Sequence, residues 1–214
     1  MNEELLIIFA IVGAGVGALG WRVLRRARSP APVPAAPVVA ATGALSAVVG
    51  WRWLAGAWPS WWLPVPLVLT GLAVPLAVAD LRHRRLPDVL TLPAYPLLGV
   101  AVVVSALSGP GSGLAVRALL AGLVFGGCHL LVHVLSRRSI GAGDVKLSGA
   151  LGMAVGAVGW PAVFVGAAVA AVITVLLSTR PRWRDGVPHG PGLLGAAWLV
   201  TVFPGAGSEV IRWT

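Results

Sequence analysis

Acidic residues and cysteines are scarce in this chain of 214 residues. It holds 7 Asp and Glu against 16 Lys and Arg, and between residues 5 and 184 the acidic residues are Asp80, Asp88 and Asp144 only. The single cysteine, Cys128, excludes an intrachain disulfide and a CxxC metal site. We also find no convincing Ser/His/Asp or Cys/His set. The sequence therefore predicts neither a bound metal nor a cofactor.

Apolar residues are abundant instead. They make up 57% of the chain, with a mean hydropathy of +0.89, whereas soluble domains contain about 45–50%. This composition predicts an all-α, polytopic membrane helix bundle that forms a single integral membrane domain over residues 1–214.

About eight apolar stretches are long enough to be transmembrane helices, each needing about 20 residues. We expect them at residues 5–21, 35–51, 61–79, 89–108, 114–135, 145–159, 161–179 and 190–207. The first two form an extra N-terminal pair within residues 1–60, joined by a short Pro/Ala linker. Whether the sixth and seventh spans are separate helices stays open, because their boundary at Gly159-Trp160-Pro161 is short.

Basic residues indicate the orientation of these spans. With the N-terminus outside, 13 of the 16 basic residues fall in inner loops, which leaves Arg52, Arg117 and Arg212 outside. The net charge of +9 then matches an anionic cytoplasmic leaflet of membrane lipid, not a nucleic acid. The chain is predicted to be a multi-pass protein of the inner (plasma) membrane, with both termini outside and its aspartates at the cytoplasmic face.

Three aspartates lie at the cytoplasmic ends of predicted spans. Asp80 is either a functional carboxylate or a surface ion pair, because arginines follow it at once. Asp88, after Pro87, is typical of a helix N-cap. Asp144 stands in GAGDVKLSGALG and is either an N-cap of the sixth helix or a functional group on a glycine-rich turn.

Two carboxylates that come close together can share a proton. One then acts as a base on water and the other as an acid, which suffices to hydrolyse a peptide bond. Other candidates are weaker: His129 and His133 share a helix face as zinc ligands can, but interhelical hydrogen bonds are the favoured interpretation. His83 either tunes the protonation of Asp80 or simply belongs to the charged loop.

Three segments of the chain together resemble a known family. They are AVADLRHRRLPDVLTLP around Asp80, GAGDVKLSGALG around Asp144 and VPHGPGLLGAAW at residues 187–198. In this order they resemble the type IV prepilin leader peptidases, membrane aspartic proteases of the GxGD kind. The resemblance covers a core region of about residues 65–205.

The resemblance implies that Asp80 and Asp144 are the catalytic pair, and that Gly141, Gly143 and Lys146 shape the site. It also implies a substrate: a prepilin-like or pseudopilin protein, cut at its basic leader just before a hydrophobic N-terminal helix, in type IV pilus assembly or secretion. Many members also carry paired CxxC motifs between their first two spans and methylate the new N-terminus. This sequence has no such motif there, so we expect a short form without N-methyltransferase activity.

Two other functions are compatible with the same residues. A small proton-coupled transporter would use the aspartates as a proton relay, although that predicts carboxylates nearer the middle of the membrane. A non-catalytic pilus-assembly membrane protein would keep the motifs for packing alone.

Overall fold

The computed structural model describes residues 2–136, 140–183 and 186–205. In these residues the chain forms eight α-helices and no strand, as the sequence predicts. The helices are α1 (Asn2–Arg26), α2 (Ala35–Leu54), α3 (Pro64–His83), α4 (Asp88–Ser108), α5 (Ser112–Leu135), α6 (Ala142–Val158), α7 (Trp160–Ser178) and α8 (Gly190–Val202). One cluster of buried apolar side chains includes residues from all eight.

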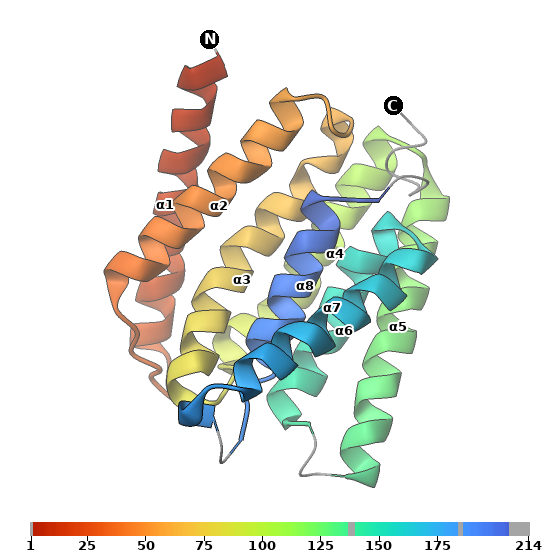
Figure 1. Cartoon of the computed structure of the whole chain (residues 1–214). Helices are drawn as coiled ribbons and strands as arrows, with labels where there is room; N and C mark the ends of the chain where they lie inside the picture. Colours follow the sequence, from red (N-terminus) through yellow and green to blue (C-terminus); the bar gives the residue numbers. More distant parts are fainter. Residues whose placement is uncertain (1, 137–139, 184–185, 206–214) are drawn as a thin grey trace.

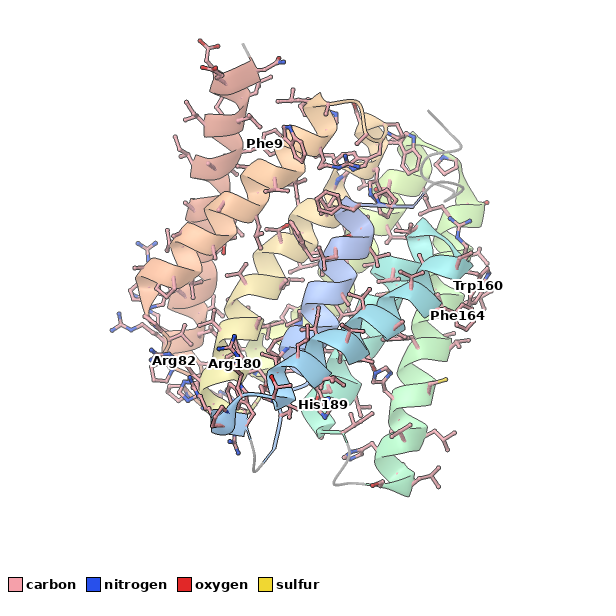
Figure 2. The ribbon with its side chains drawn as sticks, in the orientation of Figure 1. Phe9, Arg82, Trp160, Phe164, Arg180 and His189 are labelled. Atoms are coloured by element: carbon pink, nitrogen blue, oxygen red, sulfur yellow. The ribbon has the colours of Figure 1, made fainter. Side chains whose placement is uncertain are left out.

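The helices run up and down, so that alternate connections lie at the same end of the bundle (Figure 1). The connections α1–α2, α3–α4, α5–α6 and α7–α8 share the lower end in the figure, which we call the basic end. Arg82 and Arg180 mark it in Figure 2. The order of the helices thus places the basic loops at one end of the bundle, as expected from the predicted spans.

The boundary between α6 and α7 is a single residue, Gly159. Its φ of 152° and ψ of 163° belong to a conformation that glycine adopts and other residues avoid. Trp160 and Pro161 then begin α7, where a proline is tolerated because the first N–H groups need no partner. The sixth and seventh spans are therefore separate helices.

Six helices are long and apolar enough to cross a membrane: α1, α2, α3 with its preceding turn, α4, α5 and α7. The other two, α6 and α8, have 17 and 13 residues, and most of their side chains are buried. The predicted span 190–207 was too long, since α8 ends at Val202. In Figure 1, α8 runs through the middle of the bundle. The chain is a multi-pass membrane protein in which two short helices are enclosed by longer ones.

Glycines allow α5 and α6 to pack closely. A Cβ atom at Gly126 would lie 3.2 Å from the Cα of Gly149, and one at Gly152 would lie 2.8 Å from the Cβ of Phe125. Such distances leave no room for larger side chains at this crossing.

At the opposite end of the bundle, tryptophans of the α2–α3 connection contact the end of α8. Trp51 is exposed, but Trp58 and Trp62 are buried, and their indole N–H groups donate to the carbonyls of Val202 and Thr201. These carbonyls lie in the last turn of α8 and have no partner within the helix. The two buried tryptophans therefore fix the end of the central helix.

Candidate active site

Asp80 lies in the last turn of α3 and is 5% exposed. Its Oδ2 accepts a hydrogen bond of 3.0 Å from the backbone N–H of Gly190, the first residue of α8. The first N–H groups of a helix lack partners in their own helix and favour negative charge. The start of the central helix therefore holds the Asp80 carboxylate.

Glycine is required at position 190 by this contact. A Cβ atom there would lie 2.7 Å from Asp80 Oδ2 and 3.1 Å from Leu86 Cδ2. Both distances are shorter than ordinary van der Waals contact. Any side chain at Gly190 would push α8 away from Asp80.

Asp144 lies in the first turn of α6 and is 8% exposed. The helix begins after Gly141, and no side chain caps it, so the N-cap interpretation of Asp144 is wrong. One carboxylate oxygen, Oδ2, lies beside Gly141, where a Cβ atom would be 3.2 Å from it. Its other oxygen, Oδ1, is buried and has no hydrogen-bond partner within the described residues. A buried carboxylate oxygen without a partner is costly, and such atoms are found where a substrate or water is bound.

The fold brings the two carboxylates together from different helices. Asp144 and His189 both lie within electrostatic range of the Asp80 carboxylate. Leu86, in the α3–α4 loop, lies next to both Gly143 and Gly190. A Cβ atom at Gly143 would be 3.1 Å from Leu86 Cβ, and a Cβ atom at Gly190 would be 3.1 Å from Leu86 Cδ2. Leu86 thus sets the spacing between the glycine turn of α6 and the start of α8.

A cavity of about 340 Å³ reaches Asp144. Phe125 and His129 of α5, Ala170 and Thr174 of α7, and His189 with Leu193 of α8 are among its walls. Asp80 is not a wall of this cavity, although its neighbour His189 is. Figure 2 shows His189 near the basic end of the bundle. The cavity is largely apolar and lies directly beside one carboxylate.

Lys146 lies two residues after Asp144 but is turned toward α4. Its Nζ donates to both carboxylate oxygens of Asp88 at 2.9 Å. Asp88 is the first residue of α4 and Pro87 takes the N-cap position without a side-chain bond, so the N-cap prediction for Asp88 is wrong. With the extended backbone of Pro87 at the N-cap position, the helix starts one residue earlier than predicted, and the Asp88 carboxylate is free to reach Lys146 of α6.

His83, His129 and His133 each make a hydrogen bond with a backbone carbonyl. His129 Nδ1 bonds to the Phe125 carbonyl of its own helix at 2.8 Å, so the interhelical bond predicted for it is wrong. His133 Nδ1 bonds to the Ile140 carbonyl just before α6. His83 Nε2 bonds to the Pro32 carbonyl in the α1–α2 linker. Across the described residues, no three His, Cys, Asp or Glu side chains gather as a metal site would need.

The sequence interpretation assigned no role to Leu86, His189 or Gly190. The signal for the last two was present in VPHGPGLLGAAW, where a glycine followed by proline begins a helix. Nothing in the sequence alone indicated that this helix would start against Asp80.

Known proteins have sequences similar to this chain over the region that contains Asp80 and Asp144. The sequence profile described as "Type IV leader peptidase family" matches residues 67–176. The prepilin leader peptidase/N-methyltransferase of Aeromonas hydrophila is 33% identical over 204 residues, which cover 91% of this chain and 67% of the relative. The Aeromonas salmonicida protein of the same name is 31% identical over 161 residues, covering 72% and 53%.

A third relative of that name, from Burkholderia pseudomallei, is 37% identical over 137 residues, covering 61% of this chain and 43% of the relative. The chain thus spans between about two fifths and two thirds of the length of these curated relatives. No solved structure matches the chain.

Proposed function

Because this chain belongs to the type IV leader peptidase family, we propose that it is a membrane aspartic endopeptidase whose catalytic pair is Asp80 and Asp144. The observation that carries the proposal is the approach of these two buried carboxylates from α3 and α6. The profile match includes both aspartates.

Two carboxylates at this site can divide the work of peptide hydrolysis. One takes a proton from a water molecule as the water oxygen bonds to the carbonyl carbon, and the other donates its proton to the carbonyl oxygen. Proton transfer to the amide nitrogen then allows the C–N bond to break. Asp144 is a wall of the cavity, and its buried Oδ1 has no hydrogen-bond partner within the described residues, which supports giving it the role of base toward the water.

We assign Gly141, Gly143 and Lys146 to shaping the site. The backbone of Gly141 lies beside the Asp144 carboxylate, and the lack of a side chain at Gly143 leaves space for Leu86. Lys146 ties the first turn of α6 to α4 through Asp88. Lys146 therefore acts as a positioning residue rather than as a direct contact to substrate.

We propose prepilin-like or pseudopilin proteins as the substrates. The names of the relatives include prepilin leader peptidase, and the apolar walls of the cavity are compatible with the start of a hydrophobic helix. The arginines of the basic end support placing the site at the cytoplasmic face of the inner membrane.

We confine this proposal to the peptidase reaction. The relatives' names also include N-methyltransferase, and the resemblance connects that reaction with paired CxxC motifs between the first two helices. In this chain the segment from Arg26 to Ala35 contains no cysteine.

The test is cleavage of a co-expressed prepilin-like protein by full-length variants. Asp80→Asn and Asp144→Asn should each lower the cleavage rate by about 10³-fold, because each removes one acid–base group. Glu3→Gln is the matched control, since it makes the same chemical change in the first turn of α1. Thermal unfolding in detergent shows that each variant is folded. Full processing by either folded aspartate variant would refute the proposal, and proton flux in liposomes that depends on both aspartates, without cleavage, would favour a transporter.

A further inference from the structure

A second cavity, of about 630 Å³, lies at the basic end and shares no wall with the cavity at Asp144. We call it the linker groove. Arg28 and Ser29, just after α1, form one side of it, Arg85 comes from the α3–α4 loop, and Val89 and Leu92 come from the start of α4. In Figure 1 the end of α1 and the α3–α4 connection both lie at the lower end of the bundle.

The groove has an excess of positive charge. Arg28 is exposed and makes no hydrogen bond or ion pair with any other residue in the part of the chain that the structure describes. Arg85 donates one bond to the Pro30 carbonyl, which fixes its position and leaves further N–H groups for a ligand. Asp88 is the acidic residue of the groove, but Lys146 holds both of its oxygens. Two guanidinium groups are therefore available to an anion.

The other side of the groove is apolar and faces outward. Val89 is 36% exposed and Leu92 is 54% exposed. They belong to α4, which is long and apolar enough to cross a membrane. A free phosphate ion would gain nothing from these side chains, whereas an acyl chain would bury them.

We propose that the linker groove binds an anionic phospholipid. The headgroup phosphate accepts hydrogen bonds from Arg28 and Arg85, and an acyl chain lies along Val89 and Leu92. Basic pockets at the cytoplasmic ends of membrane helices are suited to anionic headgroups in this way, and guanidinium groups match the oxygens of phosphate.

The groove also adjoins the aspartate pair through Leu86. This residue is a wall of the groove and packs against the turns at Gly143 and Gly190. A bound headgroup would restrain the α3–α4 loop from the side opposite to the carboxylates. Lipid binding itself does not depend on the peptidase proposal and can be measured without a substrate.

The experiment uses the purified full-length protein in a neutral detergent. Short-chain phosphatidylglycerol is titrated, and binding is followed by the midpoint of thermal unfolding and by native mass spectrometry. We expect saturable stabilisation by phosphatidylglycerol, with little effect of phosphatidylcholine that has the same acyl chains. Arg28→Gln should weaken binding about fivefold, the effect of one basic residue near a membrane surface.

The matched control is Arg180→Gln, which removes one exposed charge from the same end of the bundle but outside the groove. It should leave the affinity unchanged. Because Arg28 has no partner to lose, its variant tests the site without disturbing the fold. Equal binding of phosphatidylcholine, equal stabilisation by inorganic phosphate, or an equal loss in Arg180→Gln would each overturn the proposal.

Discussion

At the scale of single residues, the absence of a side chain at Gly190 lets the backbone N–H of this residue reach Asp80 Oδ2 at 3.0 Å. Gly190→Ala places a Cβ atom 2.7 Å from that oxygen, so the helix or the carboxylate has to move. We expect at least about a tenfold loss of cleavage rate, since displacement of a catalytic group by about 1 Å is already costly.

The control for Gly190→Ala is in the same helix. A Cβ atom at Gly195 would meet only Ile173 Cδ1, at 3.5 Å, an ordinary contact. Gly195→Ala should therefore keep its activity. Cleavage assays of both variants with one substrate make the comparison, and equal activities would mean that the Gly190 contact does not position Asp80.

The ion pair between Lys146 and Asp88 offers a second test at this scale. Lys146→Asp places two carboxylates opposite each other and should lower the cleavage rate several-fold, while Asp88→Lys in the same chain should restore it. Both side chains are about half exposed, so the pair stabilises the fold by only about 0.5 kcal/mol. The measurement is a double-mutant cycle of kcat and KM. Additive effects in the cycle would show that the pair does not position α6.

At the scale of elements, the glycines between α5 and α6 decide how closely the two helices approach. Gly126 faces Gly149, whereas a Cβ atom at the adjacent Gly127 would have no heavy atom within 4 Å. Gly126→Val should therefore destabilise the protein by about 1–3 kcal/mol through overpacking, and Gly127→Val should have little effect. Thermal unfolding in detergent compares the two, and similar melting temperatures would contradict the close packing.

The sequence predicted the helices well because their signals are local. Apolar length and flanking charge located the eight helices, but the sequence left the boundary between the sixth and seventh spans open, and the structure places it at Gly159. The C-terminal end of α8 and the partner of Asp88 were missed, because they depend on contacts between segments far apart in the chain. Trp62 reaches Thr201 and Lys146 reaches Asp88 across more than 50 residues of sequence, and no periodicity indicates such pairs.

In the candidate site too, some residues could be predicted from the sequence and others could not. Asp80 and Asp144 stood out because carboxylates are rare in an apolar chain, and the fold brings them into electrostatic range. The contribution of Gly190 is a backbone N–H, which every non-proline residue carries, so residue type alone could not identify it. Leu86 was equally hidden, since a buried leucine in a membrane protein is unremarkable until its neighbours are known.

At the scale of the whole molecule, the distribution of arginines predicts that the basic end faces the cytoplasm. Single cysteines can test this in a Cys128→Ser background. Ala55→Cys lies in the exposed turn after α2, and Thr179→Cys lies in the exposed turn after α7, at the basic end. A maleimide that does not cross membranes should label Ala55→Cys in intact cells and Thr179→Cys only after permeabilisation. The reverse pattern would invert the orientation and contradict a cytoplasmic active site.

The shortness of α6 and α8 has a consequence for biogenesis. A helix moves from the translocon into the lipid by itself when its own side chains favour lipid. Helix α6 carries Asp144 and Lys146 in its first two turns, and α8 has only 13 residues, so neither meets this condition well. We expect α6 to enter the bilayer as a hairpin with α5, and α8 to dock last into a bundle already formed. Asp80, made early in synthesis, then gains its Gly190 partner only when the late helix arrives, so a nascent chain would lack proteolytic activity until that step.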